Sequence, residues 1–291
     1  MATGFELDRS REAGGPASRR APRGIDAGKR SVMGVMVDVI DYDAAVEKVV
    51  AAAVDRRPFI LTALAVHGVM TGVSDRVFGA RLNAFDVVAA DGQPVRWALN
   101  LLHAAGLREW VSGPELTLRV LRRAAAEALP VYLYGSTAQT VEQLAASLTG
   151  MLPQLRIAGA EASKFRPARP GEPAQIADRI NRSGARLVLV GLGCPRQETF
   201  VHAMRPLLAM PLLAVGAAFD YHAGRLAPAP RPMQRYGLAW LWRLMFEPRR
   251  LWRRYLLLGP GYLLRLSAQK MRLWTPAAPE PAFRLPDPPP V

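Results

Sequence analysis

The sequence predicts an α/β protein with a Rossmann-like fold, in which an open, mainly parallel sheet carries helices on both faces. Two observations lead to this prediction. Short apolar runs alternate with segments whose apolar residues recur at helical spacing, and most of the runs end at Gly, Asp or Ser. Strands and helices that alternate at this spacing are typical of parallel βαβ units around a buried sheet. With 291 residues, half of them apolar, the chain can bury a sizeable core.

The apolar runs are nearly continuous, as in strands that are covered on both faces. Taken in chain order, the expected strands are residues 57–66, 85–91, 129–136, 155–161, 185–193 and 210–218. The stretches of helical periodicity that precede or connect them are residues 46–54, 93–103, 114–128, 137–149, 172–183 and 197–208. No internal repeat of fixed period is visible.

Composition divides the chain into four parts. Residues 1–31 are rich in Arg, Gly, Ala, Pro and Ser without periodicity, and residues 275–291 are largely proline, so both tails are expected to be disordered. Residues 32–230 are expected to form the Rossmann-like domain. Residues 231–274, which we call the appendage, are expected to form basic amphipathic helices.

The chain is expected to stay in the cytoplasm. No signal peptide is recognised near its start, and the longest apolar run, residues 206–219, is short for a membrane span and contains Pro211. The single cysteine, Cys194, permits neither an internal disulfide nor a cysteine-based zinc site, which agrees with a reducing compartment.

Most of the formal net charge of +14 belongs to the appendage, which holds nine arginines and one lysine against a single acid, Glu247. A charge confined in this way argues against nucleic acid as a partner. Arginines alternate with Trp, Leu, Phe and Tyr at helical intervals, interrupted at Pro248 and at residues 259–261. Such helices either lie in the interface of an anionic membrane or pack on their own domain.

Ligands of open α/β sheets sit outside the carboxyl ends of the strands. This rule selects a group of residues that follow or end the expected strands: Thr62, Asp91, Gly92, Gly135, Ser136, 191–198, Phe219 and Asp220. Glycines at such positions let backbone approach a ligand, and the N-terminus of the following helix attracts phosphate. The same glycines can also be simple tight turns.

Five sequence blocks carry a resemblance to a known family. They are ADG (90–92), SGPEL (112–116), VGLGCPRQE (190–198), VGAAFDYHAG (215–224) and GLAWLWRLMFEPRRLWRRY (237–255). Their order and spacing resemble the WecG/TagA/CpsF glycosyltransferases, glycosyltransferase family 26, over roughly residues 32–258. The resemblance implies inverting, metal-independent transfer of a hexose or N-acetylhexosamine-type sugar from a UDP-sugar to a polyprenyl-diphosphate-linked saccharide. It also implies a role in bacterial exopolysaccharide, teichoic acid or surface-antigen synthesis, at the inner face of the cytoplasmic membrane.

The resemblance also assigns roles to individual residues. Asp91 is expected to be the general base, because an inverting transfer needs a carboxylate or imidazole beside the acceptor hydroxyl. The alternative is that Asp91 caps the helix that starts at Gln93. The residues expected to bind the nucleotide sugar are Thr62, Gly135, Gly191, Gly193, Gln197, Glu198 and Asp220. For Glu198, a carboxylate in the first turn of a helix is an equally ordinary explanation.

Two positions depart from the family pattern. Ala65 stands where the family has Asn, and Trp110 stands where the family usually has an arginine suited to stabilising the leaving diphosphate. Arg108 or an arginine of the appendage could replace that cation. The appendage candidates for the diphosphate or the lipid acceptor are Arg243, Arg249, Arg250, Arg253 and Arg254.

Other features point to no further chemistry. Asp41 and Asp43 imitate a metal-binding Asp-x-Asp, but their position before the first helix favours capping. We therefore expect no metal and no cofactor. The expected partners are the UDP-sugar, the lipid-linked acceptor and an anionic membrane. A homo-oligomer is also compatible with the sequence. The alternative function is a non-enzymatic nucleotide- or nucleic-acid-binding Rossmann domain with a basic tail.

Overall fold

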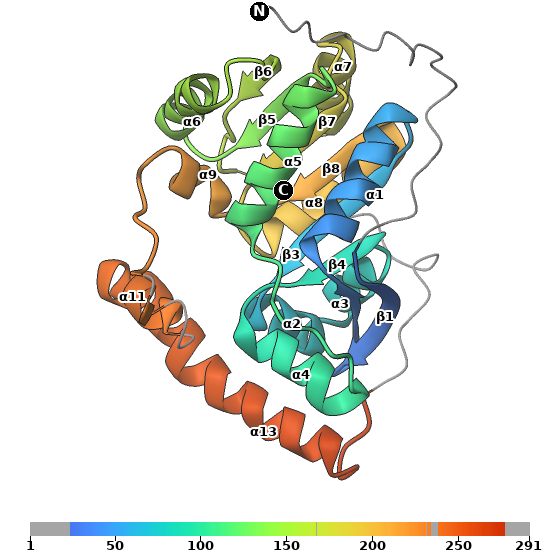
Figure 1. Cartoon of the computed structure of the whole chain (residues 1–291), viewed down its shortest axis with the longest axis vertical. Helices are drawn as coiled ribbons and strands as arrows, with labels where there is room; N and C mark the ends of the chain where they lie inside the picture. Colours follow the sequence, from blue (N-terminus) through green and yellow to red (C-terminus); the bar gives the residue numbers. More distant parts are fainter. Residues whose placement is uncertain (1–23, 167, 231, 234–237, 277–291) are drawn as a thin grey trace, which may run out of the picture.

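Eight strands form one sheet, and helices cover both of its faces (Figure 1). The computed structural model describes residues 24–276 except 167, 231 and 234–237, and it does not describe the side chains of residues 250 and 254. The order across the sheet is β1-β2-β4-β3-β8-β7-β5-β6. The strands are β1 (Asp26–Val32), β2 (Val35–Ile40), β3 (Phe59–Leu64), β4 (Val87–Ala90), β5 (Val131–Gly135), β6 (Ile157–Glu161), β7 (Leu187–Gly191) and β8 (Pro211–Ala214).

The strands from β2 to β6 across the sheet pair in parallel, and β1 pairs antiparallel with β2 at one edge. The predicted α/β Rossmann-like class is therefore confirmed, and all six expected strands are present. The hairpin of β1 and β2 was not predicted, and β1 begins inside the range expected to be disordered. Its residues are mostly polar, because an edge strand is held by backbone pairing and buries little. Positive φ values at Met33 (56°) and Gly34 (90°) make the tight turn.

The helices form two layers, in which hydrophobic clusters pack against opposite faces of the sheet. The first layer contains α2 (Val66–Ser74), α3 (Arg76–Asn83), α4 (Gln93–His103), α7 (Glu172–Arg182) and α8 (Arg196–Met204), which a 3₁₀ turn (Arg205–Leu207) extends. The second layer contains α1 (Tyr42–Val54), α5 (Gly113–Ala126), α6 (Ala138–Met151) and α9 (Ala218–His222). Helices α2 and α3 were not predicted, since their apolar positions are interrupted by small and polar residues.

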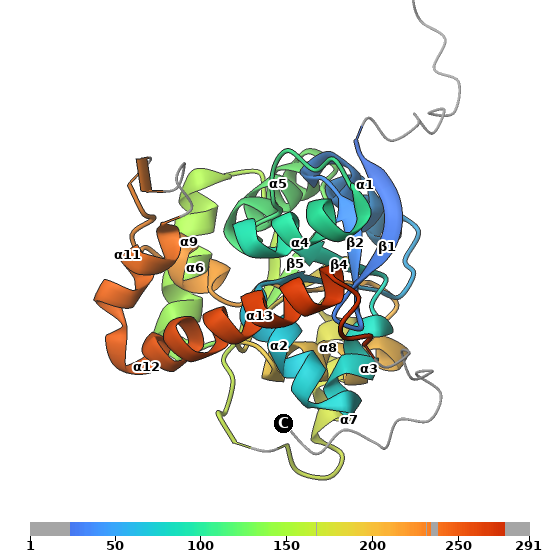
Figure 2. The same ribbon diagram turned by 90° about the horizontal axis from the view of Figure 1, so that it is seen from below.

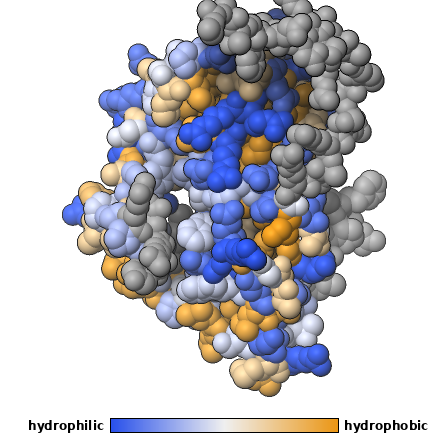
Figure 3. Space-filling view, viewed as in Figure 1, coloured by the Kyte–Doolittle hydropathy of each residue, from blue (hydrophilic) through white to orange (hydrophobic). Residues whose placement is uncertain are grey.

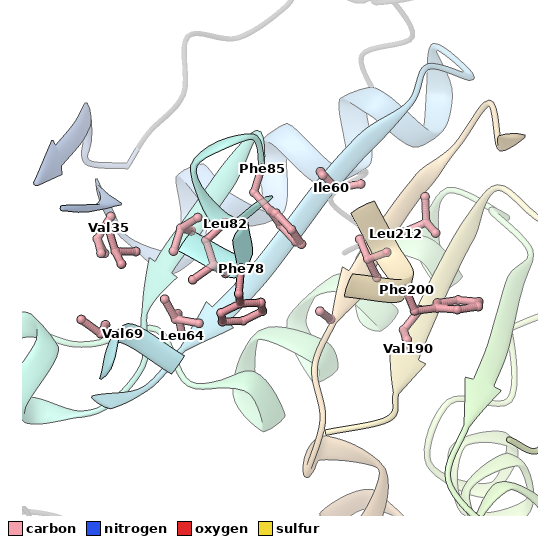
Figure 4. Packing of buried hydrophobic residues seen from close by; sticks show 14 of the residues in the cluster. Val35, Ile60, Leu64, Val69, Phe78, Leu82, Phe85, Val190, Phe200 and Leu212 are labelled. Carbon is pink, nitrogen blue, oxygen red and sulfur yellow. The ribbon is translucent and has the colours of Figure 1, made fainter. Parts of the chain in front are cut away.

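Alternation along the strands divides the core between the two layers. In β3, Ile60 and Leu64 face the first layer, whereas Phe59 and Leu61 face the second. Figure 4 shows the first of these clusters, with side chains from α3 and α8 packed over the strands. Because the alternation places apolar residues on both faces, the sheet is buried throughout and only its edges reach solvent.

The appendage folds back as a helical arm below the sheet domain (Figure 2). It consists of α11 (Ala239–Phe246), α12 (Pro248–Trp252), a π-helical turn (Arg253–Leu257) and α13 (Leu258–Lys270). The break expected at residues 259–261 was wrong: they form the first turn of α13, which continues directly from the π-helical turn. The break expected at Pro248 is confirmed, since α12 begins there.

Helix α13 lies beside α2 and α4 and attaches the arm to the domain (Figures 1 and 2). The Tyr262 side chain is buried, and its hydroxyl donates to the carbonyl of Pro94 over 3.1 Å. Further along, Met33 N–H donates to the side-chain oxygen of Gln269 over 3.0 Å. The contact between Met33 and Gln269 joins the first strand hairpin to the last helix. Within the described residues, no helix is long and apolar enough to cross a membrane.

Candidate active site

Asp91 lies directly beyond β4, at the carboxyl edge of the sheet, where it meets the start of α5. The loop before α5 is fixed there because Val111 N–H donates to the carbonyl of Ala90 over 2.9 Å. The carboxylate of Asp91 accepts a hydrogen bond from the backbone N–H of Gly113, the first residue of α5. Helix α4, by contrast, begins at Gly92 and Gln93 without a side-chain cap. The cap considered for Asp91 on α4 is therefore absent, and Asp91 serves α5.

The SGPEL block explains this arrangement. The hydroxyl of Ser112 lies 3.1 Å from that of Tyr42 and does not cap α5, so the first N–H of the helix is left to Asp91. A Cβ atom at Gly113 would lie only 3.0 Å from the carbonyl oxygen of Val215. Glycine therefore allows α5 to approach the end of β8 closely.

The environment of Asp91 raises the pKa of its carboxyl to about 7. Burial of the carboxyl group is the largest cause, because an ionised group loses hydration there. The charge of Arg243 and the Gly113 hydrogen bond act in the opposite direction. A carboxyl that titrates near neutrality can accept a proton in the physiological range and return it to water.

Arg243 reaches this region from α11 of the appendage. Its guanidinium lies 5.9 Å from the ring centre of Tyr221 and 3.5 Å from a carboxylate oxygen of Glu247. Its Nε is buried and has no hydrogen-bond partner among the described residues. Trp242 packs the same helix onto the domain and donates to the carbonyl of Ala227 over 3.3 Å. Arg243 therefore acts electrostatically on Asp91, and its Nε–H donor has no hydrogen-bond partner among the described residues.

A cavity of about 220 Å³ lies between α9 and α11, next to these groups. Arg243, Tyr221 and Arg225 are among the side chains that line it. Because an arginine can bind two oxygens of a phosphate at once, this cavity suits an anionic group.

Thr62, Gln197 and Glu198 form a buried network rather than an open surface. The Thr62 hydroxyl and the Gln197 amide both donate to one oxygen of Glu198, over 3.0 and 2.9 Å. Gly193 N–H donates to the Gln197 side-chain oxygen over 3.1 Å. Thr62 and Glu198 are 0% exposed. Burial raises the pKa of Glu198, although the hydrogen bonds oppose this. Through the hydrogen bond between Gly193 and Gln197, the network holds the loop that follows β7.

The expected nucleotide-binding glycines all lie at the ends of neighbouring strands. A Cβ at Gly135 would lie 2.6 Å from the carbonyl oxygen of Gly191, and one at Gly191 would lie 2.6 Å from the ring of Phe219. Both glycines are thus required by close packing. Gly193 has a φ of 77° and open space where its Cβ would be, so its backbone is accessible. Asp220 is half-buried on α9.

The structure describes the side chains of two of the remaining candidate arginines of the appendage. Arg249 and Arg253 are exposed, and Arg253 lies over the ring of Trp252 at 5.3 Å. The side chains of Arg250 and Arg254 lie outside the described residues. Arg108, the other proposed replacement for the missing family arginine, is also exposed.

Sequence reasoning missed two groups of this site. Gly113 and Tyr221 fall inside blocks that were quoted for the resemblance, yet neither was selected, because their importance depends on what lies opposite them in space.

The role expected for Asp41 is confirmed, since its carboxylate accepts from Ala44 N–H over 3.0 Å at the start of α1. Among the described residues, no three His, Cys, Asp or Glu side chains gather as metal ligands would.

A mainly parallel sheet covered on both faces, with a buried carboxyl at its carboxyl edge, defines a protein of the Rossmann-like α/β class with a candidate active site at that edge. The comparison with known families is more specific. Residues 30–276 match the Glycosyl transferase WecG/TagA/CpsF family, and the chain belongs to that family. It is therefore a glycosyltransferase, and its family indicates a nucleotide-sugar donor, a sugar acceptor and a place in cell-surface polysaccharide biosynthesis. The match extends over the appendage and favours the transferase over a non-enzymatic nucleotide binder.

Proposed function

We propose that the chain transfers a hexose or N-acetylhexosamine-type sugar, with inversion, from a UDP-sugar to a polyprenyl-diphosphate-linked saccharide. The observation that carries this proposal is that a buried carboxyl, Asp91, lies at the carboxyl edge of the sheet within the electrostatic influence of Arg243. One group can take a proton and the other can hold a phosphate, which are the two tasks that the reaction requires.

Asp91 acts as the general base in this mechanism. Its carboxylate takes the proton of the acceptor hydroxyl as the hydroxyl oxygen attacks the anomeric carbon from the face opposite UDP. The bond between that carbon and the diphosphate oxygen breaks in the same step, and UDP leaves with the electron pair. A pKa of about 7 keeps a substantial fraction of Asp91 ionised at neutral pH while making the carboxylate a stronger base than an exposed aspartate.

Arg243 stabilises the charge that develops on the leaving diphosphate. It occupies the role left open by Trp110, and its buried Nε has no competing partner among the described residues. Arg249, Arg250, Arg253 and Arg254 then serve the second diphosphate, that of the lipid acceptor, or the headgroups around it. Gln197 and Asp220 are assigned to the uridine end, with Thr62 and Glu198 holding Gln197 in place.

The proposed acceptor and the exposed surface of the appendage support a location at an anionic membrane. Large apolar side chains are exposed along its helices, including Phe246 (61%) and Leu264 (74%). Figure 3 shows apolar residues gathered along the lower part of the molecule, where α11 and α13 lie. Trp97 and Leu101 on the adjacent α4 are also exposed. Aromatic and aliphatic groups beside arginines are suited to the interface of an anionic bilayer.

The test is a transfer assay with a panel of UDP-sugars and a polyprenyl-diphosphate-linked acceptor, followed by NMR assignment of the new anomeric centre. We expect one donor to be preferred, inversion at the anomeric carbon, and thermal protection of the enzyme by UDP. Retention of configuration, or protection by a different nucleotide and none by UDP, would overturn the proposal.

A further inference from the structure

A second cavity lies on the face of the sheet covered by α3, α7 and α8. It has a volume of about 420 Å³, which is within the range of small-molecule sites. None of the residues assigned above to the donor, the acceptor or catalysis lines it. Its walls come from α3, α7, α8, β5, the loop after β6 and the loop after β7.

Most of the cavity wall is apolar and preformed. Tyr134 and Phe200 stack with parallel rings 4.6 Å apart, and Phe78 and Ile176 complete the buried surface. Phe165 at the rim is 52% exposed and has a φ of 49°, an unusual conformation for a bulky residue.

Arg81 on α3 lines the cavity and is only 5% exposed. Its Nε and Nη2 are inaccessible to solvent and have no hydrogen-bond partner among the described residues. A buried guanidinium whose N–H donors lack hydrogen-bond partners is costly, so a fold that keeps one usually gains something from it.

Asp75 is the acid that acts on Arg81, and its charge raises the pKa of Arg81 against the effect of burial. One oxygen of its carboxylate accepts from Phe78 N–H over 3.0 Å as the cap of α3, and no hydrogen bond joins Asp75 to the buried Nε and Nη2 of Arg81. The pKa of His202, on α8, is lowered mainly by burial. The charges of Arg81 and Arg205 lower it further. His202 and Arg205 therefore supply Arg81 with no negative charge.

Two other cations of the cavity, Lys164 and Arg166, are paired with Glu172. Glu172 accepts from Lys164 over 2.6 Å and from Arg166 over 2.8 and 3.0 Å, which closes the loop over the cavity. Arg196 is exposed at the rim. Arg81 is thus the buried cation that a ligand would meet inside the cavity.

We infer that this cavity binds a small organic anion, a phosphate or carboxylate attached to an aromatic or apolar body, with Arg81 holding the anionic group. The body packs against Phe78, Tyr134 and Phe200, and the anion supplies the hydrogen bonds that Nε and Nη2 lack. This site is independent of the transfer reaction and can regulate or stabilise the enzyme without touching Asp91.

The experiment uses the full chain and titrates phenyl phosphate and benzoate by calorimetry, with thermal denaturation in parallel. Benzyl alcohol, which has the ring without the charge, is the matched neutral probe. We expect saturable binding of phenyl phosphate, benzoate or both, which also identifies the preferred anion, and no measurable binding of benzyl alcohol.

Three variants test the assignment. Arg81→Met keeps the packed stem without the charge, and we expect binding at least about tenfold weaker together with an unliganded melting temperature equal to or above wild type. Ala203→Phe fills the cavity while leaving Arg81 in place, and should also abolish binding. Arg76→Met on the same helix, exposed and outside the cavity, should bind as wild type.

Several results would overturn the inference. One is that neither anion binds, or that Arg81→Met binds as tightly as wild type. A second is that Arg81→Met melts well below wild type, which would make Arg81 a structural group. A third is that UDP competes with the anion, which would make the cavity part of the donor site. The transfer assay is a separate measurement, so failure here leaves the proposed function standing.

Discussion

The guanidinium of Arg243, on the appendage, acts electrostatically on the carboxyl of Asp91 at the end of β4 and lowers its pKa against the effect of burial. The two residues come from distant parts of the chain and meet only because α11 folds back over the carboxyl edge of the sheet. The appendage therefore contributes to the site itself as well as to the exposed apolar surface.

Replacing Asp91 by Asn should reduce kcat by roughly a hundredfold or more, the usual scale for loss of a general base. Asn can still accept the Gly113 hydrogen bond, so the fold and UDP protection should persist. Near wild-type turnover would show that Asp91 serves only α5.

The same variant should change stability with pH. The folded-state pKa of Asp91 is raised from 3.8 to about 7, so the folded chain retains a proton that the unfolded chain releases. Stability of the wild type therefore falls as pH rises through this window. Asp91→Asn should melt above wild type at pH 8 and close to it below pH 4, as measured by thermal denaturation. Equal differences at both pH values would contradict the assigned pKa.

Replacing Arg243 by Gln should move the ascending limb of the profile of kcat/KM against pH to higher pH, because Arg243 lowers the pKa of Asp91. We also expect kcat to fall at least about tenfold, since a cation at the leaving group acts on the transition state. Arg272→Gln, an exposed arginine at the far end of the appendage, is the control and should leave the limb in place. An unchanged limb in Arg243→Gln would exclude coupling to the base.

Replacing Thr62 by Val should lower the free energy of unfolding by about 1–3 kcal/mol, because the buried carboxyl of Glu198 loses a donor. Thr149→Val is the control: its hydroxyl donates to the Ala145 carbonyl on an exposed helix surface, so the effect should be small. Urea denaturation measures both. Loss of UDP protection without loss of stability would instead indicate that Thr62 contacts the ligand.

Replacing Phe246 and Leu264 by Gln should reduce binding to anionic liposomes in flotation assays, while transfer to a water-soluble short-chain acceptor persists. Raising the salt concentration should weaken wild-type binding further, since the arginines contribute about 1 kcal/mol each near an anionic surface. Val54→Gln with Met151→Gln changes apolar residues of comparable exposure on α1 and α6 and is the control. Equal flotation of the two double variants would place the membrane contact elsewhere.

Addition of EDTA should leave transfer activity nearly unchanged, as the resemblance to a metal-independent family implies. The assay is the same transfer reaction before and after chelation. Strong inhibition that magnesium or manganese reverses would contradict this prediction.

The sequence alone determined the α/β class, six of the eight strands (β3 to β8) and the residues that end them. These features follow from local periodicity, because a strand buried on both faces must be apolar along its length and its end is marked by Gly or Asp. The helical nature and strong basicity of the appendage were equally readable. The edge strand β1 was not, because it pairs through its backbone and carries no apolar signal.

Only the tertiary structure decided what surrounds each candidate site residue. Asp91 was expected to act as a base or to cap α4, and its place against α5 depends on a loop pinned to β4 from further along the chain. Thr62 and Glu198 were expected at a ligand, and packing places them in a buried network. Arg81 attracted no attention in the sequence, since an arginine becomes unusual only when folding buries its N–H donors without hydrogen-bond partners. Periodicity is a local property of the chain, whereas burial, pKa and hydrogen-bond partners are set by segments that only folding brings together.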